Sequence, residues 1–337
     1  SLNAGMEPTG LNTLTSTYSI EFALFKHMYE NLVTLDDDDN TAPGAAESWD
    51  YDEDTLTYTF HLRKDGVWTN GDPVTAKDFE FAWSQALNPD VASDYAYFLY
   101  FIKNAEKYFN GEVTWDEVGV KVVDDYTLEV TMEQPTPYAL FLFSFGTLAP
   151  INQRFYEAVG ADLYSTEAQY FCTSHNDKIV MQKNDAWHGA ADVEVEEIDW
   201  KIIADANAAL SSFLAGDLDM VGLGTGELIK QATAAGATIQ SYTDGSAFYI
   251  YFNNNDKYLS NVNLRRALFN AIDEQKGYEA EKKTGLYRHV HHGGAAELYP
   301  AAWLPCSTYC VARRRDGGSA QPRRLCADAF AVPFGHC

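Results

Sequence analysis

Residues 55–62 alternate between two kinds of side chain without interruption. Leucine and aromatic residues stand at Leu56, Tyr58, Phe60 and Leu62, and threonine or histidine takes each position between them. A period of two in β-branched and aromatic residues is typical of a strand with one buried face. The segment therefore predicts a strand over 55–62 that packs on a core.

The next residues predict a hairpin and a helix. Turns are expected at 63–66 and 70–73, with a return strand beginning at Val67 and Trp68. Thr75 stands where an N-cap should, with Asp78 three residues later as in a capping box. Apolar residues then recur at helical spacing until a proline ends the pattern. Strand, hairpin and helix make a rigid unit, a scaffold rather than a site.

The wider stretch 43–83, PGAAESWDYDEDTLTYTFHLRKDGVWTNGDPVTAKDFEFAW, resembles the signature region of the family 5 extracellular solute-binding proteins. The shared elements are A-E-S-W, T-F-x-L-R-K-D, W-x-N-G-D-P-V-T-A-x-D-F and a following tryptophan. Proteins of this family are peptide receptors of ABC importers. The resemblance implies an α/β fold of mixed-sheet lobes, periplasmic-binding-protein-like, of type II and cluster C.

Charge and hydropathy exclude some function classes. The 337 residues carry 24 Lys+Arg against 49 Asp+Glu, a net charge of −25. Nucleic acid is excluded as a partner, because its phosphates need basic residues. No apolar run is long enough to span a membrane, and no signal or anchor segment opens the chain. The resemblance implies an extracytoplasmic protein, periplasmic or a cell-surface lipoprotein, and if the protein is exported, Ser1 is not its native start.

Several other segments have clear patterns. Residues 20–33 predict an amphipathic helix, residues 91–110 an aromatic-rich helix, and residues 120–132 a second hairpin. A strand over 193–203, a helix from Asp205 to Gly216 and a strand from Asp219 predict a crossover in a parallel or mixed sheet.

The resemblance implies a ligand cleft between two hinged lobes. It aligns a loop before the first helix, the tyrosine of an S-x-Y motif and a loop after a later strand with this cleft. An ordinary core role for Tyr95 and an ordinary loop role for Gly224 are the alternatives. The residues expected to bind ligand are Thr17, Tyr18, Ser19, Tyr95, Gly224 and Thr225.

The resemblance fails at two places. A core strand of the family is missing between Ser174 and His175, as though a segment had been excised. From Gly277 onward basic residues outnumber acidic ones, and four of the five cysteines gather there. Family members continue well beyond this point with most of their second binding lobe, so we expect a truncated C-terminal lobe.

We expect four parts in the chain. Residues 1–29 and 153–252 form a discontinuous main sheet lobe, and residues 30–152 an inserted αβ lobe. Residues 253–276 begin the second binding lobe. Residues 277–337 are an atypical tail, which we interpret as a shifted reading frame, foreign sequence or an unordered segment.

Neither a cofactor nor a resident metal is expected. Asp36, Asp38, Asn40 and Glu47 fall at calcium-loop positions, but Thr41 replaces the glycine that the turn needs. A solvated acidic turn is the simpler interpretation. The histidines at 289, 291 and 292 look like metal ligands, because imidazoles two residues apart can converge on one ion, but no acidic partner follows them. The cysteines of the tail have no recognised zinc spacing.

The sequence favours a monomeric receptor that captures oligopeptides and delivers them to permease subunits in the membrane. Nickel, haem or sugar can replace peptide within the family. A non-functional product of a damaged receptor gene is the first alternative. A secreted hydrolase using carboxylates such as Glu47 and Asp78 is the second, although no catalytic motif supports it.

Overall fold

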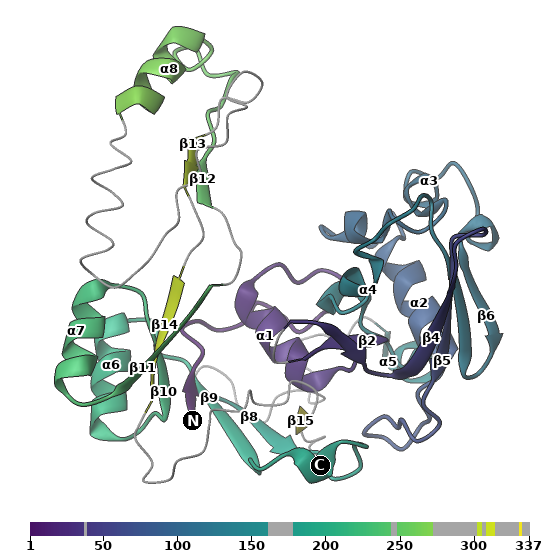
Figure 1. The fold of residues 1–337 in the computed structure, drawn as a ribbon, viewed down its shortest axis with the longest axis horizontal. Coiled ribbons are helices and arrows are strands. Elements are labelled where there is room, and N and C mark those ends of the chain that lie inside the picture. The colour runs from purple at the N-terminus through teal and green to yellow at the C-terminus, as the bar shows by residue number, and fades with distance from the viewer. Residues whose placement is uncertain are drawn as a thin grey trace. The chain divides into compact units, whose positions relative to one another are not determined.

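The computed structural model describes residues 1–36, 39–160, 178–243 and 248–271, and the backbone of strands at 302–304, 308–313 and 330–331. The chain forms two compact units (Figure 1). The large unit contains Met6–Trp200 and Ala320–Cys337, and the small unit contains Ser1–Gly5 and Lys201–Ser319.

A four-stranded antiparallel sheet organises the large unit. Its order is β4 (Ala46–Asp52), β5 (Thr57–Leu62), β7 (Thr127–Thr131) and β6 (Val120–Asp124). Alternate residues of β5 are buried, so the predicted strand and its inward face are confirmed. The strand begins at Thr57, two residues later than expected, because Leu56 has a left-handed backbone, with φ of 55°.

The predicted return strand at Val67 and Trp68 is wrong. Val67 makes only an isolated bridge to Pro73, and the Trp68 N–H donates to the Asp72 carbonyl at 2.8 Å. The loop thus closes on itself, and β5 pairs instead with β4 and β7. The second hairpin, β6 with β7, is confirmed.

Helix α2 (Ala76–Ala86) covers this sheet and begins and ends as predicted. Phe79 and Trp83 are fully buried, with Phe60 of β5 and Phe143 in the same core. The Trp83 indole N–H donates to the Leu148 carbonyl at 2.9 Å, so the largest core side chain has its polar atom paired. Burying these rings supplies much of the stability of the unit.

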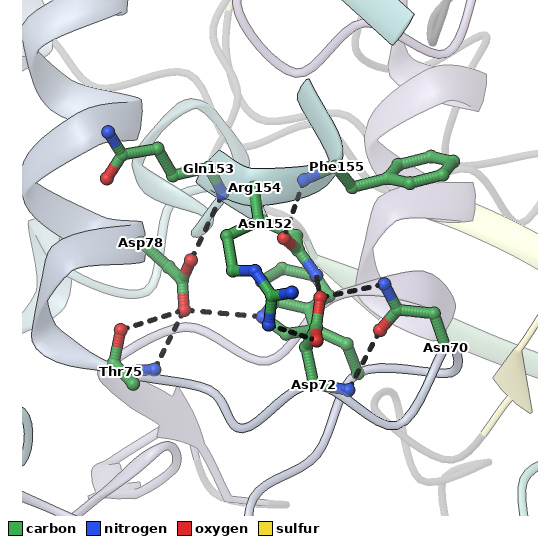
Figure 2. Close-up of polar contacts among 9 residues, drawn as sticks. Asn70, Asp72, Thr75, Asp78, Asn152, Gln153, Arg154 and Phe155 are labelled. Carbon is green, nitrogen blue, oxygen red and sulfur yellow. Dashed lines mark hydrogen bonds and ion pairs between the residues drawn. The ribbon is translucent and has the colours of Figure 1, made fainter. Parts of the chain in front are cut away.

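Two carboxylates join the start of α2 to the start of α5 (Gln153–Val159), as Figure 2 shows. Asp78 accepts from the Thr75 N–H at 2.8 Å, the Thr75 hydroxyl at 3.2 Å, the Trp68 indole at 3.3 Å and the Gln153 N–H at 3.2 Å. Asp72 accepts from the Asn152 amide at 3.1 Å and pairs with Arg154 at 2.9 Å.

Helix α1 (Ser19–Met28) leads into a small hairpin of β2 (Val33–Leu35) and β3 (Thr41–Pro43). The predicted helix over 20–33 exists but ends five residues early. Short helical segments connect the remaining parts of the large unit. These are η1 (Ala96–Leu99), α3 (Ala105–Phe109), η2 (Trp115–Glu117), α4 (Ala139–Leu142) and η3 (Gly146–Leu148).

The single helix predicted over 91–110 is wrong. Ala92 and Asn104 have left-handed backbones, with φ of 52° and 59°, which interrupts any continuous helix. Between η1 and α3, the Lys103 N–H donates to the Thr131 carbonyl at 2.9 Å and Ile102 bridges to Met132. Backbone groups that would hydrogen-bond within a helix therefore bond instead to the end of the neighbouring strand β7.

Strands β8 (Lys178–Lys183), β9 (Glu197–Lys201) and β15 (Phe330–Ala331) complete the large unit, with the single turn η5 (Ala190–Asp192) between β8 and β9. β15 pairs antiparallel with β8, and the final residue of β9 belongs to the small unit. The site of the predicted excision near Ser174 lies outside the described residues.

The small unit contains a mixed sheet in the order β11 (Thr238–Thr243), β14 (Thr308–Arg313), β10 (Met220–Leu223) and β1 (Leu2–Asn3). Helices α6 (Ala206–Ala215) and α7 (Gly226–Ala234) pack beside these strands (Figure 1). Asp205 caps α6, which ends at left-handed Gly216 as predicted. β14 belongs to the atypical tail and pairs antiparallel with both β10 and β11. The origin of the tail stays a prediction.

A two-stranded sheet and a helix complete the described part of the small unit. β12 (Phe248–Ile250) pairs with β13 (Ala302–Leu304). Helix α8 (Val262–Ala271) lies between these two strands in the sequence. Leu264 and Leu268 of α8 have exposed fractions of 38% and 41%, and no residue of this helix is buried.

Candidate ligand-binding site

The loop before α1 and the first residue of this helix carry three of the predicted ligand residues, on the surface of the large unit. Thr17 and Ser19 are exposed, and Tyr18 at the N-cap of α1 is 47% exposed. Buried Leu11 and Leu14 anchor the same loop from inside. The sequence pattern thus places three polar side chains at the surface on a loop that is held from beneath.

Glu21, in the first turn of α1, supplies the polar part of that support. Its carboxylate accepts from the N–H groups of Thr17 at 3.1 Å and Tyr18 at 3.2 Å, and from the Thr9 N–H and hydroxyl at 2.9 and 2.7 Å. Acceptance from the N-cap N–H is one half of a capping box. A carboxylate in the first helical turn also interacts favourably with the helix dipole.

Tyr95 lies in an aromatic cluster that includes α1. Its ring meets Phe22 of α1 edge-on at a centroid distance of 5.6 Å, and Phe145 at 5.7 Å. Phe98 lies 5.5 Å from Tyr95 and stacks on Phe145 at 4.2 Å. Phe22 therefore connects the helix that follows Thr17–Ser19 to the segment that carries Tyr95. The structure brings four of the six predicted residues into one region.

Tyr95 is partly buried and packs against other rings, so it has a packing role, while its ligand role stays a prediction. Tyr97, two residues later, is 54% exposed and lies 6.0 Å from the Tyr95 ring. A partly buried tyrosine suits binding, because its ring costs little entropy to hold.

Gly224 and Thr225 lie in the small unit. Both are exposed, and the Thr225 hydroxyl accepts from the Leu228 N–H at 3.4 Å as the N-cap of α7. Thr225 thus has a structural role of its own. A ligand role for these two residues stays a prediction.

An open hollow elsewhere in the large unit has a volume of about 620 Å³. Its lining includes Glu47, His61, Lys64, Asp124 and Tyr126, and none of the six predicted ligand residues. Glu47, a carboxylate of the hydrolase alternative, lies here. The other carboxylate, Asp78, is buried and accepts four hydrogen bonds from protein donors, so it holds the fold.

Within the described ranges, no group of three or more His, Cys, Asp or Glu side chains is placed to hold a metal ion. Asp36 accepts hydrogen bonds from the backbone and side chain of Asn40 in a closed acidic turn. Asp37 and Asp38, Cys172, the histidines at 289, 291 and 292, and the side chains of the tail cysteines lie outside the described residues.

Sequence reasoning missed Glu21, Phe22 and Phe145 as parts of this region. For Glu21 a signal existed, because it follows Tyr18 by the three residues of a capping box. For Phe22 and Phe145 no local pattern shows that rings so distant in sequence meet at 5.0 Å.

Comparison with known proteins yields one family. The family model of the bacterial extracellular solute-binding proteins, family 5 (middle), matches residues 40–280. The matched stretch ends close to Lys276, near the point where the sequence resemblance stops. The helices of the described part of the chain include none that is long and apolar enough to cross a membrane.

Two curated relatives are similar over most of the chain. The oligopeptide-binding protein OppA of Bacillus subtilis is 35% identical over 285 residues, which cover 81% of this chain and 52% of the relative. The periplasmic oligopeptide-binding protein OppA of Haemophilus influenzae is 33% identical over 284 residues, with the same coverage of both chains. The chain thus spans about half the length of these relatives.

Solved structures of oligopeptide-binding proteins are similar to this chain in fold. The crystal structure of Haemophilus influenzae OppA in complex with RPPGFSPFR has a TM-score of 0.75 at 32% identity, covering 82% of this chain and 56% of that one. Listeria monocytogenes OppA bound to peptide has a TM-score of 0.72 at 28% identity, covering 83% and 57%. The predicted α/β fold class is confirmed.

Proposed function

This chain belongs to the bacterial extracellular solute-binding proteins of family 5, and from that premise we propose that it binds short peptides. The family is one of solute-binding proteins, not of enzymes. The observation that carries the proposal is the similarity to oligopeptide-binding proteins over about four-fifths of the chain. The peptide-bound structures of similar proteins support it.

The proposed contacts on the large unit are Thr17, Tyr18, Ser19 and Tyr95. Their exposed hydroxyls and aromatic edges suit a ligand whose side chains vary, because rings and hydroxyls adapt to many partners. An extended peptide also offers main-chain donors and acceptors that a receptor pairs as it would an added strand. Gly224 and Thr225 are proposed as contacts from the small unit.

We propose further that the protein acts as a monomer outside the cytoplasmic membrane and delivers its ligand to the permease of an ABC importer. The net charge of −25 agrees with the exclusion of nucleic acid. The division into a main sheet lobe, an inserted lobe and the start of a second binding lobe is kept as part of this proposal.

Calorimetric titration with a mixture of short peptides, run beside a thermal melt, tests the function. Saturable binding and a melting temperature that rises with peptide concentration are the expected results. A cooperative melt with no peptide binding contradicts the proposal. Absence of a cooperative melt supports the damaged-gene alternative, and turnover of the peptide supports an enzyme.

Tyr95→Ala, measured in the same titration, tests the site. We expect about a tenfold weaker peptide affinity, equivalent to about 1.4 kcal/mol. Tyr138→Ala is the matched control, because Tyr138 is 61% exposed on the same unit and lies outside the proposed contacts. Equal affinities for the two variants contradict the role given to Tyr95.

A further inference from the structure

Glu21 is a fully buried carboxylate whose four hydrogen bonds all go to one loop. Its exposed fraction is 0%, although carboxylates are rarely buried without a partner that stabilises them. One oxygen accepts both donors of Thr9, and the other accepts the N–H groups of Thr17 and Tyr18. The two ends of the 9–18 loop thus meet at a single side chain.

The hydrogen bonds inside the loop do not reach the N–H groups of Thr17 and Tyr18. Its internal hydrogen bonds centre on Asn12, whose carbonyl accepts from Thr15 at 3.2 Å and Ser16 at 2.9 Å. Beyond Ser16, the hydrogen bonds of the loop go to Glu21 or enter α1. The Tyr18 carbonyl is already occupied, because it accepts from the N–H groups of Glu21 and Phe22 at 3.0 and 3.3 Å.

We propose that Glu21 is the positioning residue of the peptide-binding segment Thr17–Ser19, an inference that rests on the proposed function. It holds the backbone of Thr17 and Tyr18 from the buried side, and their side chains therefore stay at the surface in one arrangement. The free protein is then preorganised, so a peptide does not have to order this segment when it binds.

The same geometry defines what the segment offers a ligand. The N–H groups of Thr17 and Tyr18 are committed to Glu21, and the Tyr18 carbonyl is committed to the helix. A peptide therefore meets the hydroxyls of Thr17 and Ser19 and the Tyr18 ring, not these two amides. Contacts of this kind accept many peptide side chains and impose little selectivity.

Glu21→Gln tests the role with almost no change of shape. The amide keeps one acceptor oxygen and places an NH₂ group against donors, so one pair of the four hydrogen bonds is lost. Asp78→Asn is the matched control, because Asp78 is also a buried carboxylate at the third position of a helix and supports no proposed contact. Both variants are titrated with peptide well below their melting temperatures.

The expected result is about a tenfold weaker peptide affinity for Glu21→Gln, equivalent to about 1.4 kcal/mol, and an unchanged affinity for Asp78→Asn. A merely structural role would lower the melting temperature of both variants and leave both affinities at the parent value. That outcome overturns the proposal. If the parent itself binds no peptide, the proposed function fails. Hydrogen exchange of the Tyr18 amide then still decides whether Glu21 positions the segment.

Amide exchange of the unaltered protein supplies this second readout. With ¹⁵N-tyrosine labelling, the Tyr18 N–H should exchange slowly although its side chain is exposed, because Glu21 accepts it. In Glu21→Gln the Tyr18 amide should exchange faster while the amide of Tyr58, inside β5, does not change. Fast exchange at Tyr18 in the parent overturns the proposal even if the variant fails to fold.

Discussion

Asp78, in the first turn of α2, accepts a hydrogen bond at 3.2 Å from the backbone N–H of Gln153, which lies 75 residues further along the chain. The same carboxylate holds Trp68 and Thr75 (Figure 2). Burial raises the pKa of Asp78, and the hydrogen bonds from Thr75, Gln153 and Trp68 lower it in part. One side chain thus joins the loop after β5, α2 and α5.

Asp78→Asn should lower the free energy of unfolding by about 1–3 kcal/mol. The NH₂ group of the asparagine cannot accept a hydrogen bond, so at least one buried donor loses its partner. Urea denaturation followed by tryptophan fluorescence measures the change. A loss below about 0.5 kcal/mol would show that water or neighbouring groups replace these hydrogen bonds.

Asn152 and Arg154 both contact Asp72, yet they should differ in their effect on stability. Asn152 is buried and also caps α5, accepting the Phe155 N–H at 2.9 Å. Asn152→Ala should cost about 1–2 kcal/mol, because a cap and a buried hydrogen bond are lost together. Arg154→Ala should cost less than about 1 kcal/mol, because the arginine side chain is 81% exposed. Parallel urea titrations of the two variants compare them, and an equal loss contradicts the interpretation.

His27 should make the stability depend on pH below 6.5. Burial lowers the pKa of His27 from its ordinary value of 6.5, and nearby Lys26 lowers it further, against a hydrogen bond to the Ala23 carbonyl. Below pH 6.5 the unfolded chain then takes up a proton that the folded chain does not, so the free energy of unfolding falls as the pH falls. His27→Gln should flatten this slope between pH 6.5 and 5.

Melting temperatures of parent and His27→Gln at pH 8 and pH 5.5 check the prediction. At pH 8 the imidazole is neutral in both the folded and the unfolded state, so the difference in melting temperature between the parent and His27→Gln at this pH measures packing alone. A difference that is the same at both pH values would contradict a role for the His27 proton.

Gly146→Ala should displace Phe22. A Cβ on Gly146 would lie 2.8 Å from Cδ1 and 3.2 Å from Cε1 of the Phe22 ring. Overpacking of this kind costs about 1–3 kcal/mol. Since Phe22 contacts Tyr95, peptide affinity should also fall. Gly66→Ala is the control, because its Cβ would meet Val74 at an ordinary 3.6 Å. A Gly146→Ala variant as stable as Gly66→Ala would contradict the prediction.

Local pattern predicted those elements whose own side chains carry the signal. The alternation of Tyr58, Phe60 and Leu62 produced β5, and Asp205 with Gly216 marked both ends of α6. In each case the burial or the cap depends on neighbouring residues, which the sequence displays. The family signature extended this to the fold class and to the loop at Thr17–Ser19.

The secondary-structure predictions that were wrong share one cause. Residues 91–110 have the composition of a helix, but the backbone at Lys103 bonds to Thr131 and the chain turns at Asn104. The partner for each such group lies far away in sequence, so propensity alone does not reveal the competition. Strand β4 was not predicted, because its mostly exposed residues carry little pattern of their own and its pairing partner β5 lies elsewhere in the sequence.

The amino-acid sequence by itself determined the family, the strand-and-helix scaffold around β5 and α2, and which loop bears the proposed ligand residues. Only the tertiary structure decided that Glu21 holds that loop from beneath and that Phe22 joins it to Tyr95 and Phe145. The physical reason is that hydrogen bonds and ring contacts between distant segments depend on how the chain packs. Periodicity and capping depend on residues a few positions apart.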